Sequence, residues 1–176
     1  LNPEVSDIAE SYASTKHGVA LLVLGAVKRG GGGCACPENV LLRALVADLI
    51  LFKNQSLIMD MEAGIEHLGR ATTSGVDRML IVVEPGSRSL EGARRIVDMA
   101  EEIGLSDFSV VANKVADDRD RVFIEESLPG LGILEFIPFS DELRRVDRPG
   151  ISVLEGAGDD LRRRFASILD TLNGDG

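Results

Sequence analysis

Short runs of apolar residues recur along the chain and alternate with longer stretches of mixed character. Each run is apolar nearly throughout, a pattern typical of strands that are buried on both faces. The runs predict five strands, over residues 19–27, 56–61, 79–84, 108–113 and 132–138. Because helical patterns separate them, we expect a mostly parallel sheet flanked by helices, which is an α/β fold.

Apolar residues at helical spacing predict helices in the segments between and after the strands. The helices are expected over residues 37–52, from Ser87 or Ser89 as the cap to Gly104, over 121–128, near 142, and over 159–172. No stretch between them has the composition of an interdomain linker. The sequence therefore predicts a single α/β domain over residues 1–176.

Composition and charge exclude several classes of function. The formal net charge is −10, which disfavours binding to nucleic-acid phosphates or to an anionic membrane surface. No apolar run is long enough to span a bilayer. With two cysteines in 176 residues, a disulfide-stapled secreted fold is disfavoured, and we expect a cytoplasmic protein with no nucleic-acid or membrane partner.

An acidic segment follows the second predicted strand. Asp60 ends the strand, Glu62 comes two residues later, and Gly64 opens the loop. In phosphoryl-transfer enzymes a carboxylate at this place holds Mg²⁺, and a glycine lets its N–H approach the γ-phosphate. Asp60, Glu62 and Gly64 are therefore candidate catalytic residues, although the two carboxylates could simply end a strand at the solvent edge.

The ends of the fourth and fifth predicted strands carry a candidate purine-binding site. Asn113 and Lys114 follow one strand, and Pro138 and Phe139 follow the next. The guanine-binding pattern N-K-x-D is not met, because position 116 is alanine. An asparagine that bonds adenine, with Pro138 and Phe139 as the apolar side of the pocket, is the remaining interpretation. Asparagine and proline are also ordinary turn residues.

The segment GGGGCACPE contains both cysteines. Cys34 and Cys36 are two residues apart, so in extended backbone their side chains point the same way. A helix predicted to start at Pro37 places Cys36 near its positive end, which favours the thiolate. Two sulfurs cannot close a four-sulfur metal site, but two chains related by a two-fold axis can. We favour this shared metal site over a redox dithiol or two inert cysteines.

The motifs together resemble the CooC family, a branch of the deviant-Walker ATPases that also includes MinD and the nitrogenase iron protein. The matching segments are LNPEV, GGGGCACPENVLLRAL, IMDMEAGIEHLGRAT, VVEPGSRSLEGARRI, VVANKV and FIPFSDEL. The resemblance implies that Asp60 is the Walker B acid and that Asn113 and the loop at Pro138 form the adenine pocket. It also implies that Cys34 and Cys36 bind nickel or zinc at a dimer interface.

The function implied by this resemblance is ATP-dependent nickel insertion into carbon monoxide dehydrogenase. The expected small molecules are ATP or ADP, Mg²⁺ at Asp60, and Ni²⁺ or Zn²⁺ shared by the cysteines of two chains. The expected partners are a second copy, bound through the CxC segment, and carbon monoxide dehydrogenase.

One family motif does not occur in the sequence. The family opens with a deviant P-loop of the form GKGGVGKT, which no segment here matches, since Cys34 and Ala35 follow the glycines where the Lys-Ser/Thr pair would stand. We therefore expect a P-loop NTPase-like fold that is incomplete at the N-terminus, from a fragment, a truncation or a split gene, and inactive alone as an ATPase. The alternatives are a non-catalytic Ni/Zn-binding dimerisation module or a MinD-like positioning ATPase, and the CxC segment disfavours the latter.

Overall fold

A computed structural model of the chain describes residues 12–23, 56–61, 76–147, 152–172 and 174. The chain contains two compact units, Leu1–Val76 and Asp77–Gly176. The single domain expected over residues 1–176 stays a prediction.

The described part of the first unit begins with a β-hairpin. Strand β1 (Ser14–Lys16) pairs antiparallel with β2 (Val19–Leu21). The two residues between the strands, His17 and Gly18, have φ angles of 52° and 79°. Positive φ at both central residues is the signature of the type I′ turn, whose twist matches that of the paired strands. The His-Gly pair thus closes a hairpin that the sequence analysis did not predict.

Two of the strands predicted in this unit are not found as predicted. The prediction of a buried strand over 19–27 is wrong for the described residues 19–23, because only Val19–Leu21 form a strand and that strand is exposed. At 56–61 the structure assigns no strand, and Ile58 is 79% exposed. An apolar run becomes a strand only where another backbone satisfies its N–H and C=O groups. Residues 24–27 and the predicted helix over 37–52 lie outside the described residues.

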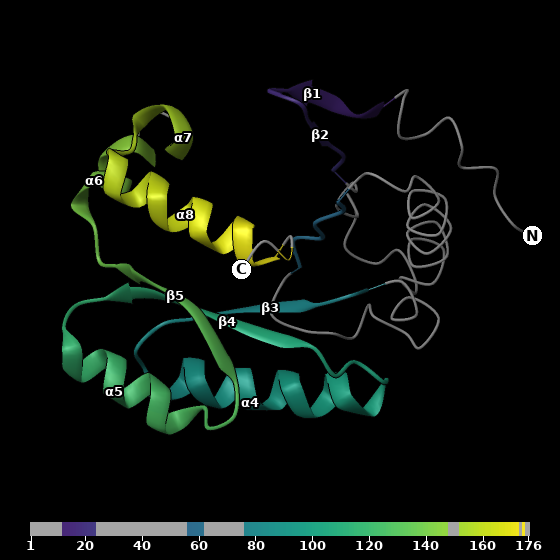
Figure 1. The fold of residues 1–176 in the computed structure, drawn as a ribbon, viewed down its shortest axis with the longest axis vertical. Coiled ribbons are helices and arrows are strands. Elements are labelled where there is room, and N and C mark those ends of the chain that lie inside the picture. Colours follow the sequence, from purple (N-terminus) through teal and green to yellow (C-terminus); the bar gives the residue numbers. More distant parts are fainter. Residues whose placement is uncertain (1–11, 24–55, 62–75, 148–151, 173, 175–176) are drawn as a thin grey trace, which may run out of the picture. The chain divides into compact units, whose positions relative to one another are not determined.

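The second unit is built on a three-stranded parallel sheet (Figure 1). Its strands are β3 (Met79–Val83), β4 (Phe108–Val115) and β5 (Gly132–Pro138), in that spatial order. The first is one residue shorter than predicted, the second is two residues longer, and the third matches. This sheet and its helices confirm the predicted α/β class.

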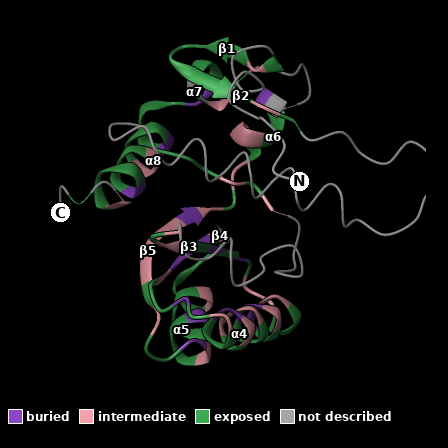
Figure 2. Ribbon diagram, turned by 90° about the vertical axis from the view of Figure 1, so that its right-hand side faces the viewer, coloured by how far each residue is buried: buried purple, intermediate pink, exposed green. Residues whose placement is uncertain are grey.

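Helices α4 (Ser87–Glu102) and α5 (Asp118–Ser127) cover one face of the sheet (Figures 1 and 2). Each follows a strand and packs back on it, as right-handed crossovers require. The core between them consists of buried aliphatic side chains, which include Ile81, Val83, Leu90, Ala93, Val110, Ala112 and Ile124.

Helix α8 (Asp159–Leu172) covers the opposite face, at β4 and β5 (Figure 2). Its bounds are those that the sequence predicts. Two shorter helices precede it, α6 (Asp141–Asp147) at the predicted place and α7 (Val153–Gly156), which the sequence analysis missed. The core on this face joins Val111, Ile137, Ala157, Leu161 and Ile168.

The two ends of α4 differ in how well the sequence predicts them. The N-cap is Gly86 and makes no side-chain cap bond, so the prediction that Ser87 or Ser89 caps the helix is wrong. The Ser89 hydroxyl instead accepts the Glu84 N–H at 2.9 Å. The predicted end at Gly104 is confirmed: its φ is 95°, and its N–H bonds back to a carbonyl of the last turn.

Candidate functional site

The carboxyl ends of the parallel strands meet at one edge of the sheet, and the predicted purine-binding residues lie there. Val115 at the end of β4 is the register partner of Pro138 at the end of β5. The Phe139 N–H donates to the Val115 carbonyl at 2.9 Å, which extends this pairing past the last strand residue. The structure therefore brings the Asn113–Lys114 and Pro138–Phe139 segments side by side.

A β-bulge displaces Asn113 and Lys114 from the regular ladder. The register pairs Ala112 with Phe136 and Val115 with Pro138, so β4 contains one more residue than β5 over this stretch. Lys114 has a φ of 59°, a left-handed conformation that costs a side-chain-bearing residue about 1 kcal/mol. The Asn113 Oδ1 accepts the Lys114 N–H at 3.0 Å. Bulges of this kind turn side chains out of a sheet and are common beside active sites.

An ion pair joins the bulge to the neighbouring strand end. The Lys114 Nζ donates to an Oε1 of Glu84, the residue that follows β3. Both side chains are about half exposed, at 53% and 51%, so the pair stabilises the fold by at most about 1 kcal/mol. Its consequence is local, because it ties the lysine of the bulge to the β3 end. Glu84 was not among the predicted site residues, although a carboxylate at the end of a predicted strand was the available signal.

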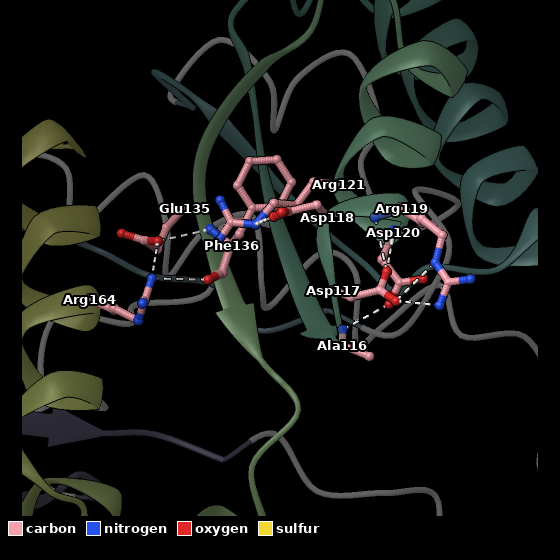
Figure 3. A network of polar contacts seen from close by, with 9 residues as sticks. All are labelled: Ala116, Asp117, Asp118, Arg119, Asp120, Arg121, Glu135, Phe136 and Arg164. Atoms are coloured by element: carbon pink, nitrogen blue, oxygen red, sulfur yellow. Dashed lines mark hydrogen bonds and ion pairs between the residues drawn. The ribbon is translucent and has the colours of Figure 1, made fainter.

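Asp117 lies one residue after position 116, where the N-K-x-D pattern has the aspartate that binds guanine. Its carboxylate caps α5 by accepting the backbone N–H groups of Arg119 at 2.9 Å and Asp120 at 3.2 Å. Arg119 also donates two side-chain N–H groups to it (Figure 3). These bonds, the Arg119 guanidinium first, hold the pKa of Asp117 below its usual value. The carboxylate is thus engaged by the start of its own helix.

A hollow of about 160 Å³ opens beside this edge, between β5 and the start of α5. Arg121 lies over the Phe136 ring, 4.8 Å from its centroid, which forms a cation–π contact (Figure 3). The lining residues are Val115, Ala116, Asp117, Asp118, Arg121, Phe136 and Pro138. Pro138 is the one member of the predicted adenine pocket among them.

The other predicted site residues belong to the first unit. Asp60 is exposed, and an exposed carboxylate suits Mg²⁺, which keeps several waters and takes one or two carboxylates. The candidates Glu62 and Gly64 and the cysteine pair, Cys34 and Cys36, lie outside the described residues. Among the residues that the structure describes, no three His, Cys, Asp or Glu side chains are grouped so that they could hold a metal ion.

No helix in the described part of the chain has both the length and the apolar character needed to cross a membrane. No family model matches the sequence.

Similar proteins share sequence with nearly the whole chain. The carbon monoxide dehydrogenase accessory protein CooC of Rhodospirillum rubrum is 40% identical over 175 residues, which are 98% of this chain and 66% of the relative. An uncharacterized ATP-binding protein of Methanocaldococcus jannaschii is 38% identical over 178 residues, 98% of this chain and 69% of that protein. The septum site-determining protein MinD of Thermotoga maritima is 26% identical over 143 residues, 77% of this chain and 52% of the relative. The chain spans about two thirds of the length of the first two.

Proposed function

Because the chain belongs to the CooC-type branch of the MinD-related deviant-Walker ATPases, we propose that it forms the base-binding and metal-binding part of a nickel-insertion ATPase that serves carbon monoxide dehydrogenase. The observation that carries this proposal is the 40% identity to a carbon monoxide dehydrogenase accessory protein over 98% of the chain. Identity to MinD is 26%, so we propose the accessory role rather than septum positioning.

The geometry of the strand ends supports an adenine nucleotide as the ligand. Since the Asn113 Oδ1 accepts the N–H of the next residue, the side-chain amino group remains to donate to a purine ring nitrogen. A guanine base would need a carboxylate to accept its ring N–H and amino group. Position 116 is alanine, and Asp117 is bound to the start of α5. Pro138 and the exposed Phe139 supply the apolar flank.

A matched pair of exposed phenylalanines tests this base site. Phe139 is 55% exposed at the strand edge, and Phe123 is 40% exposed on α5. Phe139→Ala should weaken binding of a fluorescent ADP analogue about tenfold, which corresponds to about 1.4 kcal/mol of lost ring contact. Phe123→Ala should leave it unchanged. Equal effects of the two substitutions, or displacement of the probe by GDP as readily as by ADP, would contradict an adenine site here.

Asp60 would hold Mg²⁺ through water, and the ion would neutralise charge on the nucleotide phosphates. Glu62 and Gly64 would stand beside the γ-phosphate. The phosphate-cradling motif itself does not occur among the 176 residues, so hydrolysis is proposed for the complete ATPase.

Nickel is the proposed cargo, held by Cys34 and Cys36 of two chains. Since the ligand is the thiolate, the proposed compartment is the reducing cytoplasm. Titration with Ni²⁺ or Zn²⁺ should give one ion per two chains and shift the chain from monomer to dimer in sedimentation. Binding should strengthen as the pH rises toward the thiol pKa.

The matched controls for this titration are Cys34→Ser and Cys36→Ser, each of which should abolish the metal-dependent dimer. A stoichiometry of one ion per chain, or a dimer that both serine variants retain, would exclude the shared site.

A further inference from the structure

The left-handed conformation of Lys114 depends on contacts that fix it. Its φ of 59° is disfavoured for a residue with a Cβ atom, and such a conformation persists only where surrounding groups hold it. The Lys114 N–H donates to the Asn113 Oδ1, a bond inside the bulge, and the Lys114 Nζ donates to the Glu84 carboxylate. Glu84 is 30 positions away in the sequence. It therefore supplies the bulge of β4 with a side-chain contact from another strand end.

Glu84 is itself fixed at both of its backbone polar groups. Its N–H donates to the Ser89 hydroxyl oxygen at 2.9 Å, and its carbonyl accepts the Gly86 N–H at 2.7 Å. Gly86 is the N-cap of α4, and Ser89 lies in the first turn of that helix. The next residue, Leu90, is buried in the core that α4 shares with the sheet. The Glu84 carboxylate thus extends from backbone that the start of α4 holds in place.

The bulge in turn sets the direction of the Asn113 side chain. Bulges re-aim side chains at the end of a strand, and Asn113 is half-buried at the carboxyl end of β4. Its Oδ1 is bound to the Lys114 N–H, so the amide is oriented with its amino group left to donate. A Lys114 that relaxed to extended backbone would turn the peptide that carries this N–H. The amide would then have to be ordered when a base binds, which lowers affinity.

We propose that Glu84 is a positioning residue of the adenine site, and that it acts through Lys114 to hold the Asn113 amide in the orientation that binds the base. This role rests on the proposed function, because it takes Asn113 as the residue that receives adenine. Glu84 needs no contact with the nucleotide. The supporting contacts run from the first turn of α4 to Glu84, from Glu84 to Lys114, and from Lys114 to Asn113.

A second exposed ion pair provides the matched control. Glu91 pairs with Arg95 on α4, and its side chain is 58% exposed, close to the 51% of Glu84. Glu84→Gln should weaken binding of a fluorescent ADP analogue to the 176-residue chain about fivefold, because the amide loses its fixed orientation. Glu91→Gln should leave binding unchanged. Both variants should keep the wild-type melting temperature, since exposed ion pairs contribute little to stability.

The state of the bulge can be measured without nucleotide. The ¹³C chemical shifts of Lys114 Cα and Cβ report its backbone conformation, and exchange of its amide proton reports the bond to Asn113. Both should change in Glu84→Gln and stay native in Glu91→Gln. In a Lys114→Met background, Glu84→Gln should change neither the exchange nor the affinity further, because the carboxylate has lost the group through which it acts.

Native Lys114 shifts in Glu84→Gln would overturn the proposal, because the ion pair would then not hold the bulge. Altered shifts with unchanged affinity would overturn it as well, since the bulge would then not position Asn113 for the base. If Phe139→Ala weakens binding of the analogue and Glu84→Gln does not, the adenine site stands and the role of Glu84 alone is lost. A wild-type chain that does not bind the analogue, or equal effects of Phe139→Ala and Phe123→Ala, would overturn both proposals.

Discussion

Val82 on β3 and Val111 on β4 are both valines, and they are register partners on the same face of one sheet. One is 61% exposed and the other 6%. The difference arises from α8, whose Leu161 and Ile168 pack in the core that contains Val111. Within a parallel sheet, the burial of a strand residue is thus decided by the layer above it rather than by the pattern of its own strand.

Polar contacts hold α8 over β5. Arg164 donates from Nη1 to the Glu135 Oε1 at 2.9 Å and to the Phe136 carbonyl at 3.2 Å (Figure 3). Its Nε donates to Asp160 in the first turn of α8 at 3.0 Å. Glu135 is 18% exposed and Arg164 28%, so this pair is better shielded from solvent than the surface ion pairs of the unit. On the β3 side, Arg78, the residue before the strand, donates to the Thr171 carbonyl near the end of α8 at 3.5 Å.

The largest expected effect comes from removing methyl groups on the covered side. Val111→Ala should lower the free energy of unfolding by about 2 kcal/mol, because it removes buried apolar surface and leaves a small cavity. Val82→Ala removes the same atoms from an exposed position and should change it by no more than about 0.5 kcal/mol. Urea denaturation of both variants measures the two values. Similar losses of unfolding free energy at both positions would mean that the exposed face of β3 around Val82 is covered in solution.

Adjacent arginines on α8 test the polar contacts. Arg164→Met should cost about 1 kcal/mol, since it removes two bonds to β5 while keeping most of the side-chain volume. Arg163→Met is the matched control, because Arg163 is 71% exposed and pairs with Asp160 alone. Its cost should stay within about 0.5 kcal/mol. If the two variants are equally stable, the contact of Arg164 with Glu135 and Phe136 does not hold the helix.

Lowering the pH should reduce the difference in the free energy of unfolding between the wild type and Arg164→Met. The hydrogen bond from Arg164 holds the pKa of Asp160 below its usual value. A lowered pKa means that this pairing stabilises the fold fully at neutral pH and that the stabilisation is lost as the pH falls through the lowered value. The stability difference at pH 7 should therefore shrink below about pH 4, in urea series at fixed ionic strength. A constant difference would show that the pairing of Arg164 with carboxylates contributes nothing.

Local sequence accounts for much of the second unit. The predicted bounds of β5 and α8 match the structure, because apolar runs and helical periodicity are properties of neighbouring residues. The α4 end at Gly104 was predictable for the same reason, since only the left-handed backbone of glycine was needed. Local pattern was insufficient at 56–61, where an apolar run without a paired backbone forms no strand.

The candidate site divides in the same way. The sequence by itself determined that Asn113, Lys114, Pro138 and Phe139 lie at the carboxyl ends of two strands of one parallel sheet, and that parallel strands end at a common edge. Only the tertiary structure decided that Val115 pairs with Pro138, that a bulge turns Lys114 toward Glu84, and that α8 covers Val111 while leaving Val82 exposed. The paired residues Val115 and Pro138 are 23 positions apart, and the ion-paired Glu84 and Lys114 are 30 positions apart. Such contacts depend on how the elements pack against one another rather than on the sequence of any one element.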